Sequence, residues 1–129
     1  MKHKLPVQLR FNDIDILGHL NNTVYFSLYD LGKARFMEDN GLREPGPKAP
    51  GSVIADVHCT YLQPIHYGDD IYVTTEMTEA GDRHFILEQE MIDGEGTVRS
   101  RCRTVMVCID PDTGKSAPLP EKFRELMKG

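Results

Sequence analysis

The sequence predicts a single α+β domain, residues 1–129, in which one long helix and an antiparallel sheet bury each other's apolar faces. Three observations lead to this prediction. Apolar residues recur with helical spacing over residues 22–40 and alternate with polar ones in several segments after residue 53. A chain of 129 residues with 40% hydrophobic content can also bury an adequate core without disulfides or metals.

The N-terminal half is expected to contain one strand and the helix. Leu5–Phe11 alternates loosely and is typical of a strand, and the polar segment 12–22 with Gly18 is typical of a turn. In the helix Asn22–Asn40, five apolar residues fall mostly on one face: Val24, Tyr25, Leu28, Leu31 and Phe36. Asn21 or Asn22 is suited to cap its start, and Gly41 is suited to end it.

The second half is expected to form a meander of four antiparallel strands. The Pro- and Gly-rich segment 44–51 cannot continue a helix and predicts a surface loop. Four alternating segments follow, separated by turn residues: 53–61, 71–77, 85–91 and 98–109. A short helix over Pro120–Lys128 is expected to end the chain, since proline suits a first helical position.

Charge and cysteine content restrict the partners and the compartment. The net charge of −5 argues against binding to nucleic acid or to an anionic membrane surface. The odd number of cysteines, three, includes no Cys-x-x-Cys pair, which favours a reducing compartment. No apolar signal segment follows the N-terminus, and the longest apolar run, Val105–Ile109, is too short to span a bilayer. A soluble, cytoplasmic protein is therefore expected.

The residues with the clearest chemical meaning precede the long helix. This segment contains two carboxylates, a glycine, a histidine and two asparagines: Asp13, Asp15, Gly18, His19, Asn21 and Asn22. The first N–H groups of a helix have no internal partner and carry partial positive charge, so they can stabilise an oxyanion. A nearby carboxylate can attack a carbonyl or activate water. These are the groups needed for acyl transfer, although the same residues are also common in structural loops.

The segment Asp15–Tyr25 resembles the signature of the 4-hydroxybenzoyl-CoA thioesterase family of hotdog proteins, in which a carboxylate and glycine precede Asn-x-x-Tyr. Residues 61–69, which end in Gly-Asp, resemble that family's crossing between strands. Residues 112–115 and 118–120 resemble its C-terminal turn and helix start. The resemblance covers nearly the whole chain. It implies a hotdog fold, a five-stranded antiparallel sheet wrapped around one long central helix with a short C-terminal helix, and hydrolysis of an acyl-CoA thioester.

The resemblance also implies roles for individual residues. Asp15 corresponds to the catalytic carboxylate, with Asp13 as the fallback, and the backbone N–H of Asn22 corresponds to the donor to the thioester carbonyl. Gly18 and Tyr25 are expected at the substrate cleft. His19 is expected to orient Asp15, to bind substrate or to pack the loop. Because the family's cleft lies between subunits, a homodimer or a dimer of dimers is expected.

Three further predictions concern ligands. Arg99, Arg101 and Arg103 share one strand face, which indicates either an ordinary solvated surface or a site for the phosphates of coenzyme A. Neither a metal nor a redox cofactor is expected, because no pair of residues has the spacing of zinc ligands. The alternative function is a non-catalytic hotdog module that binds acyl-CoA as a regulatory ligand, and Asp15 argues against it.

Overall fold

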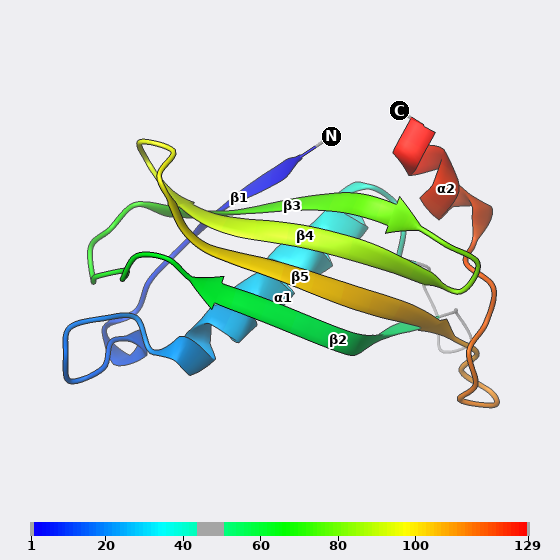
Figure 1. Ribbon diagram of the computed structural model, residues 1–129, viewed down its shortest axis with the longest axis horizontal. Helices are drawn as coiled ribbons and strands as arrows, with labels where there is room; N and C mark the ends of the chain where they lie inside the picture. Colours follow the sequence, from blue (N-terminus) through cyan, green and yellow to red (C-terminus); the bar gives the residue numbers. More distant parts are fainter. Residues whose placement is uncertain (1, 44–50, 129) are drawn as a thin grey trace.

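The computed structural model describes residues 2–43 and 51–128 (Figure 1). The elements in chain order are β1 (His3–Val7), the 3-10 turn η1 (Phe11–Asp13), α1 (Asn22–Asp39), β2 (Gly51–Tyr61), β3 (Ile71–Ala80), β4 (His84–Asp93), β5 (Val98–Ile109) and α2 (Glu121–Lys128). The predicted helices and the four later strands are confirmed to within a few residues. Of the predicted loop 44–51, residues 44–50 lie outside the described residues, and Gly51 already belongs to β2.

All five strands form one antiparallel sheet with the order β1-β3-β4-β5-β2. The predicted meander is therefore correct for β3, β4 and β5 but wrong for β2. The connection 62–70 carries the chain across the end of the sheet, so β2 pairs with β5 at one edge and β1 pairs with β3 at the other. Alternation identifies a strand but not its neighbours, and this accounts for the error.

The first strand is shorter than predicted. It ends at Val7, and Phe11 is 77% exposed instead of packing in the sheet. The chain turns because the Asp13 carboxylate accepts hydrogen bonds from the Arg10 backbone N–H at 2.9 Å and from the Arg10 guanidinium at 3.0 Å. These bonds favour the 3-10 turn over continued extension.

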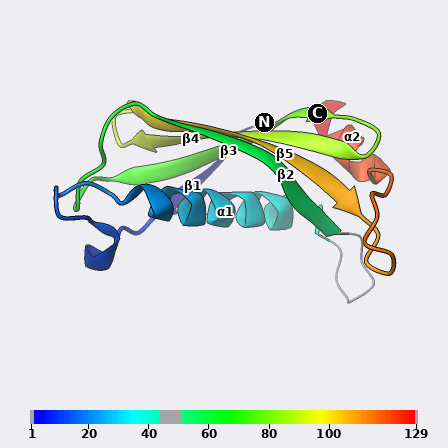
Figure 2. The same ribbon diagram turned by 60° about the horizontal axis from the view of Figure 1, so that its bottom comes forward.

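Helix α1 lies across one face of the sheet, which curves over it (Figure 2). Its buried residues are Tyr25, Tyr29, Gly32, Lys33 and Phe36. The predicted apolar face is therefore wrong at Leu31, which is 45% exposed. Gly32 and Lys33 lie on the buried side of the helix. The spacing of apolar residues does not predict their burial, because neither residue has an apolar side chain.

Gly32 lies where the helix packs closely against the sheet. A Cβ atom there would lie 2.6 Å from Val73 Cγ1 and 2.9 Å from Gln89 Nε2. The Gln89 amide donates to the Tyr29 carbonyl oxygen at 2.9 Å and to Thr75 Oγ1 at 3.0 Å. The lack of a side chain at Gly32 and the buried hydrogen bond from Gln89 to Tyr29 therefore set the distance between α1 and the middle of the sheet.

Two apolar clusters lie under the two ends of α1. The cluster near its start contains Tyr25, Tyr29, Ile65, Ile71, Val73 and Met91. The cluster near its end contains Phe36, Met77, Phe85, Leu87, Leu119 and Phe123. Helix α2 adds Phe123, whose ring centroid is 5.0 Å from that of Phe85. In the part of the chain that the structure describes, no helix has the length and apolar character needed to cross a membrane.

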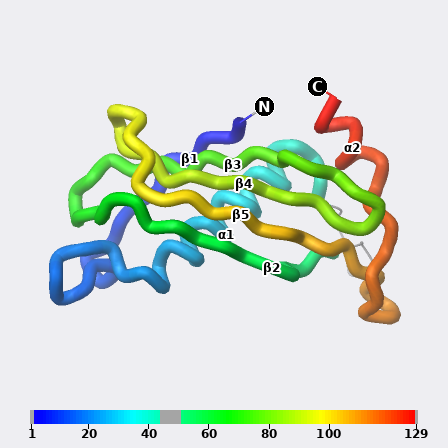
Figure 3. Tube along the Cα trace, viewed as in Figure 1, coloured from blue at the N-terminus to red at the C-terminus, as the bar shows by residue number. Residues whose placement is uncertain are grey.

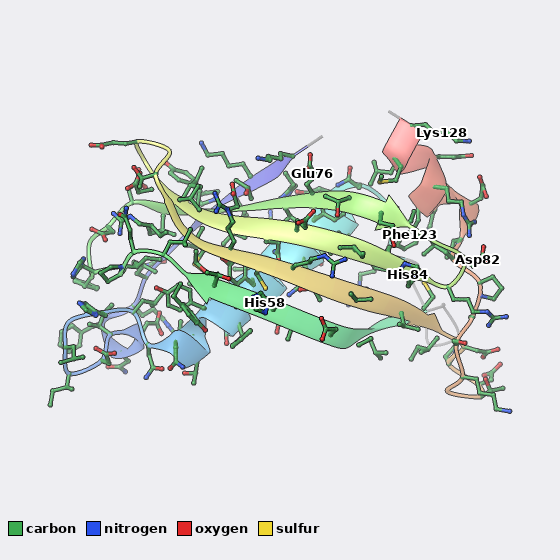
Figure 4. The ribbon with its side chains drawn as sticks, viewed as in Figure 1. His58, Glu76, Asp82, His84, Phe123 and Lys128 are labelled. Carbon is green, nitrogen blue, oxygen red and sulfur yellow. The ribbon has the colours of Figure 1, made fainter. Side chains whose placement is uncertain are left out.

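The opposite face of the sheet is rich in charged side chains. Figure 4 shows this face toward the viewer, with His58 on β2 and Glu76 on β3 labelled. Arg101 and Arg103 of β5 lie directly opposite Glu90 and Glu88 of β4 in the strand register. Opposite charges at paired positions stabilise a sheet modestly and make this face polar.

The close approach at Gly32 leads to a prediction about stability. Gly32→Ala is expected to lower the free energy of unfolding by about 1–2 kcal/mol, because overpacking against the stiff Val73 side chain outweighs the better helix propensity of alanine. Chemical denaturation would measure it. The same change in a Val73→Ala background should cost less, since the shortest of the contacts is removed while the one to Gln89 stays. An equal cost in both backgrounds would contradict this explanation.

Candidate active site

Residues 14–20 form a tight loop that ends just before α1. Ile14 and Leu20 form an isolated β-bridge at its base, and the Asp15 N–H donates to the His19 carbonyl at 2.8 Å. Gly18 has a φ of +82° and donates its N–H to the Asp15 carbonyl at 3.0 Å. The loop closes this tightly because glycine adopts the left-handed conformation at no steric cost.

The loop holds the Asp15 carboxylate by one oxygen. Oδ1 accepts hydrogen bonds from the backbone N–H groups of Leu17, at 2.9 Å, and His19, at 3.2 Å. Within residues 2–43 and 51–128, no hydrogen bond engages Oδ2. One oxygen is therefore anchored while the other is available to a reacting group.

The start of α1 supplies the second chemical group. Asn21 is the N-cap, and its side chain accepts from the Thr23 N–H at 3.0 Å, which decides between the two predicted caps. Asn22 is the first helical residue, and its N–H has no acceptor among the described residues. An N–H at this position adds the positive end of the helix dipole to its own donor capacity.

Asp15 and Asn22 line the same cavity, of about 410 Å³. Its other lining residues are His19, Leu20, Tyr25, Tyr61, Leu62, Gln63 and Pro64. The cavity thus joins the loop, the start of α1 and the chain that leaves β2. Figure 3 shows these segments at one end of the sheet, the loop in blue and the link from β2 to β3 in green.

Two tyrosines form one wall of this cavity. The Tyr25 ring is buried and packs edge-on against the Tyr61 ring at 4.8 Å. The Tyr61 hydroxyl donates to the Asn22 carbonyl oxygen at 3.5 Å. Partial burial, together with the neighbouring Cys59 thiol, raises the pKa of Tyr61 to about 12. Tyr61 is therefore a neutral donor at neutral pH. Tyr61 begins the segment that resembles the family's crossing between strands, but its place in this cavity was not predicted from the sequence.

His19 and Gly18 differ in their relation to the cavity. His19 lines it and holds Asp15 through backbone groups, whereas its imidazole packs edge-on against the His66 ring at 5.1 Å. Gly18 is not among the lining residues and shapes the turn instead. A positioning function is the one that these contacts favour for both residues.

Asp13, the fallback carboxylate, has a different environment. It is 3% exposed and lines a separate hollow with Arg10 and Phe11. Its hydrogen bonds to the Arg10 side chain are the main reason that the pKa of Asp13 is lowered. Both of its oxygens are engaged, so its geometry suits the ion pair that forms the 3-10 turn.

The structure does not bring the three arginines together at this cavity. Arg99 bridges two carboxylates, of Asp93 and Asp69, both at 3.1 Å, and donates to the Pro64 carbonyl at 2.7 Å. It therefore fixes the segment that carries the cavity wall. Arg101 and Arg103 lie on the opposite face of the sheet, where Arg101 pairs with Glu90 at 3.0 Å.

The three cysteines are free thiols, and burial raises the pKa of the Cys102 and Cys108 thiols. Inert packing residues are the interpretation that suits these two. Over residues 2–43 and 51–128, no group of three or more His, Cys, Asp or Glu side chains is arranged to hold a metal ion.

Known proteins resemble this chain over most of its length. Acyl-CoA thioester hydrolase YbgC of Escherichia coli is 21% identical over 120 residues, which cover 92% of this chain and 90% of that protein. A thioesterase from Thermus thermophilus, whose crystal structure contains coenzyme A and zinc, is 28% identical with a TM-score of 0.81, covering 98% of this chain and 97% of that one. A thioesterase superfamily protein from Jannaschia is also 28% identical, with a TM-score of 0.87, covering 95% of this chain and 78% of that one.

The family model agrees with these similarities. The model of the thioesterase-like superfamily matches residues 9–127, which include the loop, α1, all of the sheet except β1, and nearly all of α2. The antiparallel sheet curved over α1 is the hotdog fold that the sequence predicted. The chain belongs to the thioesterase-like superfamily and has its hotdog fold.

Proposed function

We propose that this protein hydrolyses an acyl-CoA thioester to a free carboxylic acid and coenzyme A, with Asp15 as the catalytic carboxylate. One observation carries the proposal: Asp15, whose Oδ2 accepts no hydrogen bond from the described residues, and Asn22, the first residue of α1, line the same cavity. The relative named as an acyl-CoA thioester hydrolase and the neighbour that contains coenzyme A support the substrate class.

The two groups suit the two charges that develop in thioester hydrolysis. The carbonyl oxygen becomes negative as the tetrahedral intermediate forms, and the Asn22 N–H stabilises it together with the helix dipole. Asp15 Oδ2 either takes a proton from the attacking water or attacks the carbonyl itself, giving an anhydride that water then cleaves. The thiol of coenzyme A leaves as a thiolate with little acid assistance, since thiols have a pKa of about 8.5.

The cavity wall provides an apolar environment for the reacting group. Tyr25, Leu62 and Pro64 contribute apolar surface, and the Gln63 amide adds a polar group. Excluding water around the carbonyl strengthens the interaction between the oxyanion and its donor. His19 and Gly18 hold the loop in the conformation that presents Asp15.

Assembly is part of the proposal, because the two edges of the sheet differ. β1 is short and contains Pro6, which protects an edge. β2 runs from Gly51 to Tyr61 as a long edge that has no partner strand among the described residues. Apolar side chains along and just beyond β2 are 40–47% exposed: Val53, Ile54, Val57, Tyr61 and Leu62. Pairing of two β2 edges about a two-fold axis would bury these groups, so we propose a homodimer or a dimer of dimers.

Asp15→Asn should preserve the fold and lower kcat by about 10²–10⁴-fold, because an amide is neither a base nor an anionic nucleophile. Steady-state assays with a panel of acyl-CoA substrates would measure this, after circular dichroism has confirmed folding. Asp13→Asn is the matched control: it should lower the melting temperature by weakening the Arg10 ion pair and cost much less in kcat. Wild-type turnover by folded Asp15→Asn would eliminate the carboxylate mechanism. Absence of turnover by the wild-type protein on the whole panel, with acyl-CoA still bound, would favour the regulatory module.

A charge on the β2 edge should disrupt the dimer. The double variant Ile54→Lys/Val57→Lys is expected to shift the mass in light scattering from two or four chains to one, because it places two cations where the edges meet. Gln8→Lys, next to β1 at the opposite edge, should leave the mass unchanged. A wild-type protein that is active as a monomer at assay concentration would refute the proposed assembly.

Charge reversal can test the predicted role of the arginines in coenzyme A binding. If Arg101 and Arg103 bind phosphates, their single Glu variants should raise KM and leave kcat nearly unchanged, which is the signature of lost uniform binding. Arg99→Glu should instead also lower kcat, since Arg99 holds the cavity wall through Pro64 and Asp69. Unchanged KM in the Arg101 and Arg103 variants would show that these arginines do not bind coenzyme A and belong to an ordinary solvated surface.

A further inference from the structure

The link between β2 and β3 contacts the loop that holds Asp15. The Leu20 N–H donates to the Ile65 carbonyl oxygen at 2.6 Å. His19 and His66 form an isolated β-bridge, and their rings pack edge-on with centroids 5.1 Å apart. The His19 N–H donates to Asp15 Oδ1 at 3.2 Å. A displacement of the link at His66 would therefore move a group that holds the carboxylate.

The same link forms one wall of the Asp15 cavity, and β5 holds it in place. The Arg99 carbonyl oxygen accepts hydrogen bonds from the N–H groups of Leu62, at 2.9 Å, and Gln63, at 3.0 Å. The Arg99 guanidinium donates to the Pro64 carbonyl oxygen at 2.7 Å. All three of these link residues line the cavity. One residue of β5 therefore fixes the backbone of this wall.

Asp69, at the end of the link, joins these two sets of contacts. Its Oδ2 accepts hydrogen bonds from the His66 N–H at 2.9 Å and from Arg99 Nη1 at 3.1 Å. The side chains of Asp69 and Arg99 are 27% and 15% exposed, so water and salt screen this ion pair less than a fully exposed one. Burial opposes ionisation of Asp69, but the hydrogen bonds from His66 and Arg99 lower its pKa overall. Asp69 is therefore an anion at neutral pH.

We propose that Asp69 is a positioning residue for Asp15, acting through His66 and His19. This inference rests on the proposed hydrolysis, because it concerns the geometry of the same site. Asp69 is not among the residues that line the Asp15 cavity, so it acts on the position of the carboxylate and not on the substrate. Its ion pair with Arg99 fixes the Asp15 loop relative to the opposite wall. A misplacement of about 1 Å can cost about 10²-fold in rate.

Asp93 offers a matched control, because it is the other carboxylate that pairs with Arg99. Asp93 Oδ2 lies 3.1 Å from the Arg99 guanidinium, and the Asp93 side chain is 15% exposed. Its Oδ1 accepts hydrogen bonds from the N–H groups of Glu95 and Thr97, in the turn between β4 and β5. None of these bonds reaches the loop of Asp15. Asp69→Asn and Asp93→Asn thus each remove one negative charge beside Arg99, and only the first change touches the link.

Nuclear magnetic resonance tests the proposal without any turnover. The backbone amides of Leu17 and His19 donate to Asp15 Oδ1, so their signals report how the carboxylate is held. Asp69→Asn should shift both signals, whereas Asp93→Asn should leave them nearly unchanged. The two variants should have similar melting temperatures, since each loses one ion pair of Arg99. Unchanged signals in Asp69→Asn, or equal shifts in the two variants, would overturn the proposal.

Steady-state kinetics on an acyl-CoA that the wild-type protein hydrolyses provides the second test. Asp69→Asn should lower kcat by about tenfold or more with little change in KM, because it displaces Asp15 without removing a contact to substrate. Asp93→Asn should cost much less in kcat. An equal loss of kcat in both variants, or a change confined to KM, would also overturn the proposal. Absence of turnover by the wild-type protein would instead refute the proposed hydrolysis, and the amide signals would still decide whether Asp69 positions Asp15.

Discussion

The close packing of α1 against the middle of the sheet at Gly32 is the constraint on which the rest of the structure depends. Val73 and Gln89 approach the helix backbone so closely that a side chain at Gly32 has no room. The Gln89 amide then ties the Tyr29 carbonyl to the sheet, which fixes the rotation of the helix as well as its distance. The orientation of the first N–H groups of α1 follows from this contact, although Gly32 lies far from the cavity.

The loop with Asp15 is connected to the helix and to the sheet by backbone hydrogen bonds. The Asn21 N–H donates to the Asp13 carbonyl at 2.9 Å, and the Leu20 N–H donates to the Ile65 carbonyl at 2.6 Å. The carboxylate and the Asn22 N–H are thus parts of one rigid backbone framework. Preorganisation of this kind stabilises developing charge without a conformational change at the moment of reaction.

Local sequence patterns predicted the elements and a cap at Asn21 or Asn22, because strand alternation and capping depend on near neighbours. They did not predict that β2 crosses to the far edge, since strand neighbours depend on contacts distant in sequence. The predicted site residues Asp15 and Asn22, which lie in one continuous segment, line one cavity. Tyr61 and Gln63 also line it but come from another part of the chain, and their place there was not predicted. Arg99 was predicted as a surface or phosphate-binding residue, because its carboxylate partners become visible only when the strands are paired.

The way Asp15 is held has an evolutionary consequence. Both hydrogen bonds to its Oδ1 come from N–H groups of its own loop, so they do not depend on the identity of the side chains at Leu17 and His19. The opposite wall comes from residues 61–64, a separate segment between two strands. If this cavity is the acyl site, as proposed above, mutations in that segment can change the acyl groups that are accepted while the carboxylate keeps its geometry. Selection can therefore act on specificity and on chemistry separately, and relatives can diverge in substrate while they retain one reaction.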